Sequence, residues 1–391
     1  MRFPEFHGEW EEHGLSEYLD FKNGLNPDSK RFGKGIKFIS VMDILNNPVI
    51  TYDCIRASVQ ATDAEMSSFS VENGDILFQR SSETLEDVGR ANVYIDDKVA
   101  VFGGFVIRGK KKANYNPLFF RYLLSSPYAR KRIIPMGAGA QHFNIGQEGL
   151  SKVLLNFPSI EEQTKIASLL HLLDERIATQ SKLIEDLKKL KSAIIVEHYR
   201  QTEKNEVCVA DLGNHFNVGN LAKDDLSETG KPCIIYGELF TTYGEIISQI
   251  ESHTNKTEGM ILSKKGDLLF PSSTTVDAVS LIAPSVINVD NVILGGDMFG
   301  IHINHNYNTQ YLSYYFNHIA KKQLAKFAKG STIIHLHYTD IEKAKLLLPS
   351  LEEQNRMAKC LVALDKKVSV EQNLLSSLTC QKSYLLQQMF I

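Results

Sequence analysis

The chain has 391 residues, of which 43% are hydrophobic and 23% are charged, and its formal net charge is −3. This composition is that of a folded globular protein of two or three domains, and no apolar run reaches the roughly 18–20 residues that a membrane span needs. A net negative charge argues against nucleic-acid binding unless basic residues are concentrated in particular segments.

The N-terminal segment and the cysteines point to a cytoplasmic protein. Residues 1–10 contain acids and no apolar core, so we expect no signal peptide. The five cysteines are scattered, and none forms a Cys-x-x-Cys pair. We therefore expect neither a disulfide framework nor a metal site, which suits a reducing compartment.

The first 158 residues are predicted to form a mixed domain. Alternating apolar stretches predict strands, and these stretches are 36–41, 74–78, 91–95 and 99–107. An amphipathic pattern predicts a helix over 117–134. We therefore expect an α+β domain.

A polar loop, Gln79–Arg90, follows the predicted strand 74–78. It offers side chains of the kinds that contact DNA: Arg80, Ser81, Ser82, Thr84 and Arg90. Arginine is the commonest reader of guanine, and hydroxyl side chains contact phosphates or bases. The alternative is an ordinary polar loop.

A basic segment follows in the same domain. From Lys98 to Gln147 there is no acidic residue, and the segment includes the run Lys110, Lys111 and Lys112. Its glycine-rich loop 137–144 holds Gln141, His142 and Asn144, and the amides of Gln and Asn can read adenine. This segment would suit a surface that faces phosphates, although such a run is also typical of a solvated face.

A long helix is predicted after Pro158. Ser159 and Glu162 have capping-box spacing, in which the serine accepts from the Glu162 amide and the Glu162 carboxylate reaches back to the cap. From there to about Arg200 there is neither glycine nor proline. A helix over 160–200 would be about 60 Å long.

The second half of the chain repeats the first. LLLPSLEEQ at 346–354 matches LNFPSIEEQ at 155–163, an offset of 191 residues between the prolines (349 − 158). GDLLF at 266–270 matches GDILF at 74–78, and Gly295-Gly296 matches Gly103-Gly104, at an offset of 192. Two copies with so long a period do not make a solenoid.

The second copy predicts the same elements with different loops. We expect a strand over 298–303, a helix over 310–327 and a long helix after Ser350, whose cap partner is Glu353. The candidate DNA contacts in its polar loops are Ser272, Ser273, Thr274, Thr275, Lys329, Ser331, Thr332, His335 and His337. The stretch 298–339 has no acid. His335 and His337 lack a neighbouring carboxylate or cysteine, so we do not expect them to bind a metal.

The two long helices share a pattern of apolar residues spaced by three and four, which is typical of a coiled-coil seam. Polar residues interrupt the seam at matching places: Gln180 and Lys191 in the first helix, and Glu371 and Lys382 in the second. They could lie at the seam edge with their charges in water. Alternatively, antiparallel helices would pair Lys191 with Glu371 and Gln180 with Lys382, which would set the register. Such helices would separate two similar domains with approximate twofold symmetry.

The order of domain, Pro-x-x-Glu-Glu-Gln helix, domain and Pro-x-x-Glu-Glu-Gln helix resembles the specificity subunit of Type I restriction–modification systems. PEFHGEW at 4–10, GDILFQRSSETLEDVGRANVY at 74–94 and GAGAQHFNIGQEGLSKVLLNFPSIEEQ at 137–163 are similar to segments of that family. The resemblance covers the whole chain. It implies target recognition domains over 1–158 and 204–349, separated by spacer helices over 159–203 and 350–391.

The resemblance also implies a function. The chain would be a non-catalytic subunit that reads a bipartite target in double-stranded DNA and binds two adenine methyltransferase subunits and restriction subunits, which are motor–nucleases. It would bind no cofactor itself, whereas S-adenosylmethionine, ATP and Mg²⁺ would serve its partners. The alternatives are a self-contained DNA-modifying enzyme with an unrecognised site and a structural protein-binding adaptor.

Overall fold

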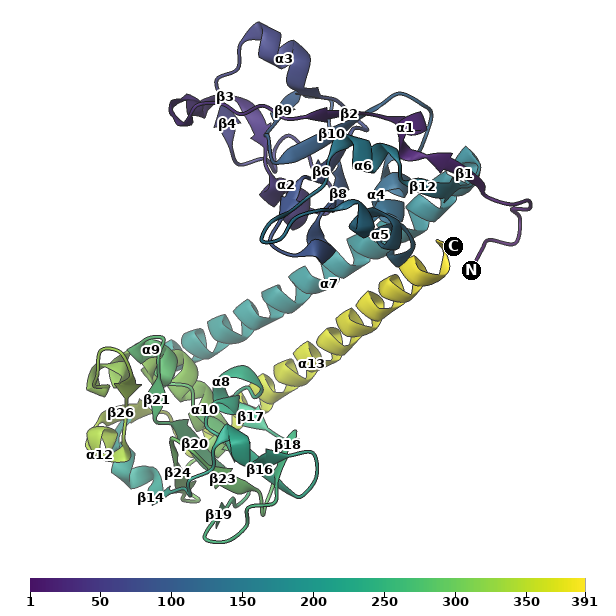
Figure 1. Ribbon diagram of the computed structural model, residues 1–391. Helices are drawn as coiled ribbons and strands as arrows, with labels where there is room; N and C mark the ends of the chain where they lie inside the picture. The colour runs from purple at the N-terminus through teal and green to yellow at the C-terminus, as the bar shows by residue number, and fades with distance from the viewer. Residues whose placement is uncertain (391) are drawn as a thin grey trace. The chain divides into compact units, whose positions relative to one another are not determined.

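The computed structural model describes residues 1–390, which form two compact units. Unit 1 contains residues 1–182 together with the C-terminal stretch from Gln372, and unit 2 contains Leu183–Glu371. Each unit has a mixed domain and part of both long helices, α7 (Ile160–Gln201) and α13 (Leu351–Gln388) (Figure 1). Within these residues, no helix has the length and apolar character needed to cross a membrane.

The domain of unit 1 is built on two four-stranded sheets. In spatial order, the first consists of β2 (Leu19–Asn23), β10 (Val106–Lys111), β6 (Ile76–Gln79) and β8 (Ala91–Val93), and the second of β4 (Ser58–Val59), β3 (Phe32–Ile39), β9 (Ala100–Phe102) and β5 (Ser70–Val71). Two further pairs join β1 (Glu11–Gly14) to β12 (Leu154–Phe157), and β7 (Ser81–Ser82) to β11 (Phe143–Asn144). The helices are α1 (Leu15–Tyr18), α2 (Val41–Asn46), α3 (Asp63–Phe69), α4 (Pro117–Ser125), α5 (Pro127–Ile133) and α6 (Gln147–Ser151).

The domain of unit 2 has two five-stranded sheets. In spatial order, the first consists of β14 (Gly213–Asn217), β24 (Met298–Ile303), β20 (Asp267–Pro271), β22 (Ser285–Ile287) and β17 (Ile246–Ile247), and the second of β15 (Leu226–Ser227), β18 (Ser252–Thr254), β16 (Lys231–Ile235), β23 (Ile293–Gly295) and β19 (Ile261–Leu262). The pairs are β13 (Asn205–Cys208) with β26 (Lys345–Leu348), and β21 (Ser273–Thr274) with β25 (Ile334–His335). The helices are α8 (Glu238–Thr241), α9 (Ala278–Leu281), α10 (Thr309–Tyr315), α11 (Lys321–Leu324) and α12 (Tyr338–Ile341).

The repeat extends to the backbone of the sheets. β6 pairs with β10 antiparallel in unit 1, and β20 pairs with β24 in the same way in unit 2. The repeated Gly-Asp before β6 and β20 has a local cause. Gly74 and Gly266 have φ values of 92° and 93°, a region that favours glycine, and each following aspartate accepts a hydrogen bond from the amide three residues before it.

Three expected elements are broken in the structure. The predicted strand 99–107 is two strands, β9 and β10, joined by a turn at 103–105. The predicted helix 117–134 is divided into α4 and α5, because Pro127 starts a new helix that Ser126 caps. The predicted helix 310–327 is α10 followed by a wide π-type turn and α11. The strand over 298–303 and the long helices are confirmed.

The glutamine of each Glu-Glu-Gln motif joins its domain to its long helix. The Gln163 side chain accepts from the Asn116 amide at 3.1 Å and donates to the Pro158 carbonyl at 3.0 Å. Gln354 makes the same two bonds, to Asn308 at 2.9 Å and to Pro349 at 2.9 Å. Both glutamines are buried. The motif therefore fixes the start of each long helix against the helix that Asn116 or Asn308 caps.

Only one of the two hydrogen bonds of each predicted capping box is present, the one accepted by the serine. Ser159 and Ser350 accept from the amides of Glu162 and Glu353, both at 3.3 Å. The Glu162 carboxylate, however, binds the guanidinium of Arg2 at 2.7 and 2.8 Å, and Glu353 binds His198. The expectation that these carboxylates return to the cap is wrong, because the guanidinium groups of Arg2 and Arg356 bind Glu162 and Glu353 and are stronger partners than a neutral amide.

The predicted helix register is also wrong. Within unit 2, the Lys191 ammonium binds Asp365, which lies six residues before Glu371. Within unit 1, the Lys382 ammonium binds Asp174, six residues before Gln180. Six residues correspond to about 9 Å along a helix. The apolar spacing allows several registers. The prediction considered only pairs of seam residues, and it therefore excluded Asp174 and Asp365, which lie outside the seam pattern.

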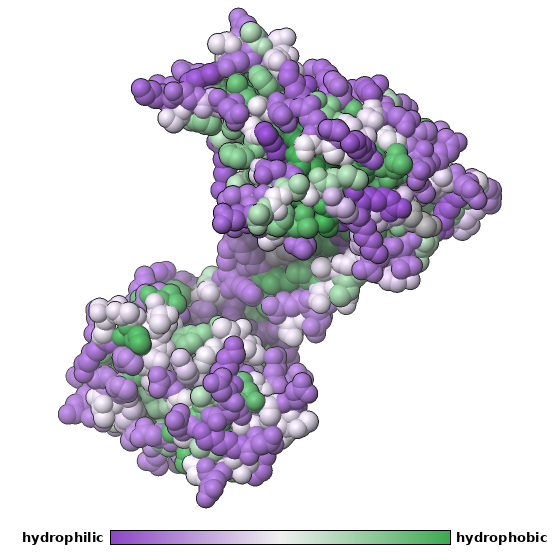
Figure 2. Space-filling view, viewed as in Figure 1, coloured by the Kyte–Doolittle hydropathy of each residue, from purple (hydrophilic) through white to green (hydrophobic). Residues whose placement is uncertain are grey.

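The seam residues are shared between the helices and the domain cores. In unit 1, Ile166 and Leu170 of α7 pack in one buried cluster with Leu385 and Met389, near the other end of the chain. In unit 2, Ile194 of α7 packs against the buried cluster that contains Met357 and Leu361 of α13. The helix segments are therefore antiparallel within each unit. On the face that Figure 2 shows, hydrophilic residues cover most of each unit, with hydrophobic patches between them.

Candidate nucleic-acid interface

The two predicted DNA-contacting loops of unit 1 lie side by side. β7, at the start of the loop Gln79–Arg90, pairs with β11 at the end of the loop 137–144, with Ser81 opposite Asn144. The Ser81 hydroxyl donates to the Asn144 side-chain carbonyl, and the Ile145 amide donates to the Arg80 carbonyl at 2.9 Å. Segments about 60 residues apart in sequence therefore form one surface, on which Gln141, His142 and Asn144 are exposed.

The same arrangement occurs in unit 2. β21 pairs with β25, with Ser273 opposite His335, and the Leu336 amide donates to the Ser272 carbonyl at 2.9 Å. Ser331, Thr332 and His337 are exposed on the second loop. The rings of His335 and His337 are nearly parallel, with centroids 6.2 Å apart. Residues 1–390 contain no group of three or more His, Cys, Asp or Glu side chains that could hold a metal ion.

A third segment, which the sequence pattern does not mark as part of the site, joins each pair of loops. The Arg80 amide donates to the Phe105 carbonyl at 2.9 Å, and its guanidinium donates to the Gly104 carbonyl at 3.2 Å. In unit 2, the Ser272 amide donates to the Asp297 carbonyl at 2.7 Å. The repeated Gly-Gly pairs could have pointed to this segment, because one pair stands at the turn in each copy.

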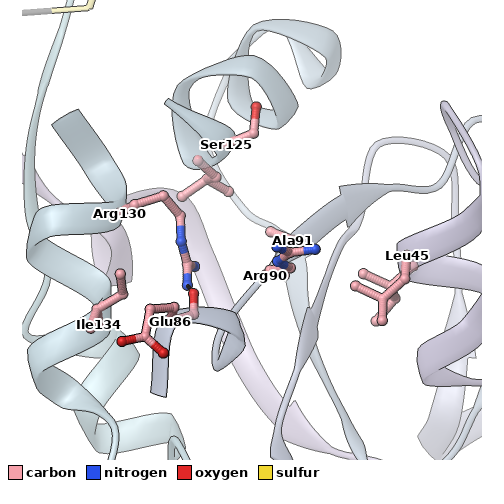
Figure 3. A pocket seen from close by; sticks show the side chains of 9 residues that line it. Leu45, Glu86, Arg90, Ala91, Ser125, Arg130 and Ile134 are labelled. Atoms are coloured by element: carbon pink, nitrogen blue, oxygen red, sulfur yellow. Dashed lines mark hydrogen bonds between the residues drawn. The ribbon is translucent and has the colours of Figure 1, made fainter. Parts of the chain in front are cut away.

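Arg130 of α5 stabilises the loop Gln79–Arg90 through hydrogen bonds to its backbone. Its guanidinium donates to the carbonyls of Glu86 and Val88, both at 2.7 Å, and Figure 3 shows the side chain reaching from α5 to Glu86. Burial lowers the pKa of Arg130 to about 10, and the nearby charge of Arg90 contributes. Glu86, Arg90 and Arg130 line a hollow of about 370 Å³. Arg90 itself binds Asp87 at 2.6 Å and remains half exposed.

Some predicted contacts are separate from this surface or covered. Lys110 and Lys111 lie at the end of β10 away from the 103–105 turn, about 17 Å along the strand. Lys110 pairs with Glu72 at 3.2 Å, and the Lys111 ammonium donates to the Tyr115 carbonyl; Lys112 follows directly after β10. In unit 2, Ser272 and Ser273 are buried, at 8% and 4% exposure, whereas Thr274 is partly exposed and Thr275 is exposed.

The loop ends also carry local ion pairs. The Lys329 ammonium lies 2.5 Å from Asp340, although the lysine remains largely exposed. The Thr84 amide donates to the Ser82 hydroxyl at 3.2 Å, which shapes the loop after β7. Each unit thus presents polar and basic side chains on a backbone fixed by short strand pairs. The geometry suits contact with base edges and phosphates.

The chain is similar to known proteins over most of its length. The family model for the Type I restriction modification DNA specificity domain matches it twice, over residues 7–189 and 202–379. The MjaX type I restriction enzyme specificity subunit of Methanocaldococcus jannaschii is 23% identical over 386 residues, covering 93% of this chain and 88% of that protein. The specificity subunit S.HindORF215P of Haemophilus influenzae is 26% identical over 282 residues, covering 66% of each chain.

The fold is that of solved specificity subunits. The S subunit of a Type I restriction–modification system from M. genitalium superposes with a TM-score of 0.61 at 16% identity, covering 100% of this chain and 99% of that one. A chain from a structural study of complex assembly in the type I R-M system superposes with a TM-score of 0.59 at 14% identity, covering 98% and 97%. On the two matches of the family model, this chain belongs to the Type I restriction–modification DNA specificity family.

Proposed function

We propose that the chain reads a bipartite target in double-stranded DNA, with one half read by each domain. The observation that carries the proposal is that the two domains share a backbone framework but present different side chains on it. β7·β11 and β21·β25 hold equivalent loops, yet Arg80 is replaced by the buried Ser272 at the same place. Because the same backbone carries different base-contacting side chains in the two domains, the two half-targets should differ in sequence.

In this proposal the domains 1–158 and 204–349 are the readers and the helices 159–203 and 350–391 are the spacers. The chain directs two adenine methyltransferase subunits and restriction subunits to the target. It performs no catalysis and binds no cofactor itself, so S-adenosylmethionine, ATP and Mg²⁺ act in the partner subunits. We place it in the cytoplasm with the DNA, consistent with its five free cysteines.

The test is methylation mapping of DNA from cells that express this chain with a cognate methyltransferase. The expected result is a split motif with modified adenines on both strands. A continuous palindrome, or no motif, would contradict the proposal. The purified chain alone, incubated with DNA and S-adenosylmethionine, should transfer no methyl group, and its binding to DNA should weaken with salt. Methyl transfer without a partner would instead indicate a self-contained enzyme.

A further inference from the structure

The turn at 103–105 of unit 1, which joins β9 to β10, is held in one conformation. The Gly103 amide donates to the Ile39 carbonyl at 3.0 Å, and the Val106 amide closes the turn onto the Gly103 carbonyl at 2.8 Å. A Cβ on Gly103 would meet the Phe38 ring at 2.6 Å, and one on Gly104 would meet the Asn26 side chain. A side chain at either position would displace Phe38 or Asn26, so glycine suits both positions and the hydrogen-bonded turn presents its third residue, Phe105, in a defined place.

The equivalent turn of unit 2 joins β23 to β24 and is held in a similar way. The Gly296 amide donates to the Gly219 carbonyl at 3.0 Å, and a Cβ on Gly295 would meet the Leu221 side chain at 2.2 Å. The residue that this turn presents is Asp297, which is exposed. The turns therefore differ in chemistry only where their side chains face solvent.

Both turn residues lie beside the first residue of the candidate reading loop. The carbonyl of Phe105 accepts from the Arg80 amide at 2.9 Å, and the carbonyl of Asp297 accepts from the Ser272 amide at 2.7 Å. The turn is thus continuous with the surface formed by the two loops of each unit. Phe105 also lies within the acid-free stretch from Lys98 to Gln147, and Asp297 directly precedes the acid-free stretch 298–339.

Phe105 is 69% exposed and lines an apolar hollow of about 420 Å³ with Phe32, Met42 and Ser81. Phe32 and Met42 are exposed as well, so the hollow is an open apolar surface beside Arg80. Among the groups that DNA presents in its major groove, an apolar side chain matches the C5 methyl of thymine. The Arg80 guanidinium, which donates to the Gly104 carbonyl at the edge of the hollow, favours DNA as the occupant over an apolar protein surface.

Asp297, in contrast to the apolar Phe105, offers a hydrogen-bond acceptor. Its Oδ2 accepts from the Ser273 hydroxyl at 2.8 Å, which orients the carboxylate. In the described part of the chain, its Oδ1 accepts no hydrogen bond. Phosphates repel a carboxylate, and the major-groove group that pairs with one is the N4 amino group of cytosine.

We infer that these turns are a third base-reading element of each domain, in which Phe105 contacts the C5 methyl of a thymine and Asp297 accepts a hydrogen bond from the N4 amino group of a cytosine. The inference rests on the proposed function. It assigns one base of each half-target a chemical identity, and it makes that identity depend on one residue per domain.

The test measures binding of the full chain, in complex with its methyltransferase, to duplexes of the mapped target. Each thymine is replaced in turn by deoxyuridine, which removes only the methyl group. One replacement should weaken binding about fourfold, the value of one buried methyl-sized group. F105A should weaken binding to the thymine duplex by a similar factor and should bind the thymine and deoxyuridine duplexes equally. The exposed Leu154 on β12 supplies a control, because L154A should retain the discrimination.

For Asp297, each cytosine is replaced in turn by N4-methylcytosine, which blocks the major-groove donor without changing the sequence. One replacement should weaken the wild-type complex about tenfold, within the range for one mismatched base pair. D297N keeps an acceptor for Ser273 but turns a donor outward. The variant should bind the cytosine and N4-methylcytosine duplexes equally, while its unfolding midpoint stays unchanged.

The outcomes separate the two proposals. A complex that methylates a split target but binds thymine and deoxyuridine duplexes alike at every position overturns the assignment of Phe105 and leaves the proposed function intact. If F105A keeps its DNA affinity and loses a protein partner, the apolar hollow is a protein contact and the inference is wrong. Absence of sequence-specific binding by the wild-type complex contradicts the proposed function itself.

Discussion

The ammonium of Lys191 lies 2.8 Å from the carboxylate of Asp365, and the same pair occurs in the other unit as Lys382 and Asp174, 2.5 Å apart. In each pair, a lysine near one end of a long helix meets an aspartate of the other helix. The aspartate also accepts from a buried tyrosine hydroxyl, that of Tyr314 or Tyr122. These contacts are equivalent under the repeat, so they define the helix register twice.

Replacing Lys191 with methionine should destabilise the protein strongly. Lys191 is buried and also binds the Glu245 carboxylate at 2.9 Å. Its removal leaves two carboxylates without their cation in a site of low solvent access, a change that costs about 3–5 kcal/mol. Denaturant unfolding measures the effect. The control is K189M, since Lys189 forms an exposed pair within one helix and its loss should leave the midpoint unchanged. Equal midpoints for the two variants would refute the role of the buried pair.

Stability should fall in acid because of Glu245. Burial alone would raise the pKa of Glu245, but the hydrogen bond with His318 and the charge of Lys191 outweigh it and lower the pKa to about 2, from 4.5. A carboxylate with a lowered folded pKa adds stability above its unfolded pKa and loses it as pH falls toward the folded one. The unfolding free energy should therefore drop by about 3 kcal/mol between pH 4.5 and 2. E245Q, followed through the same pH range, should show a smaller slope; an unchanged slope would assign the effect to other groups.

Removing the Gln354 side chain should loosen the start of α13. Q354A removes the buried acceptor of the partly buried Asn308 amide, which costs about 1–3 kcal/mol. Hydrogen exchange at the Asn308 amide should accelerate by the factor that corresponds to this loss of free energy. Q163A should do the same at Asn116 in the other unit. Gln201, exposed near the end of α7, is the matched control, and faster exchange at Asn308 in Q201A would show that the effect is not local.

Arg130 should matter for DNA binding without contacting DNA. R130M removes the two bonds to the carbonyls of Glu86 and Val88 that hold the loop Gln79–Arg90. We expect roughly tenfold weaker binding to the mapped target, equivalent to about 1.4 kcal/mol, with an unchanged slope of affinity against salt because no phosphate contact is lost. R132M, which changes an exposed arginine of the same helix, serves as the comparison. A reduced salt slope in R130M would mean that Arg130 contacts phosphate.

Arg80 should read only one half of the target. R80A removes a guanidinium that lies on the combined loop and turn surface of unit 1. Loss of a bidentate guanine contact costs about 1–3 kcal/mol of discrimination at one base pair. Methylation mapping should show relaxed sequence at one position of one half-target and an unchanged second half. Relaxation in both halves would contradict the assignment of one domain to each half.

Much of the fold could be predicted because it depends on local patterns. The absence of glycine and proline predicts the long helices, and the offset between Pro158 and Pro349 predicts two copies of one unit. The candidate loops were also predictable, since polar residues follow a buried strand in each copy. The sequence pattern does not predict the breaks at Pro127 and at the 103–105 turn, because an apolar or amphipathic pattern continues across both.

The sequence by itself determined the repeat, the class of domain and the candidate reading loops, because periodicity and turn chemistry act between neighbouring residues. Only the tertiary structure decided which distant groups meet. It places β7 against β11, it buries Ser272 while exposing Asp297, and it brings Glu245 from a domain to Lys191 on a helix. The helix register follows the same rule: several registers satisfy the apolar seam, and ion pairs with the partly buried Asp174 and Asp365, which lie outside the seam, select one of them.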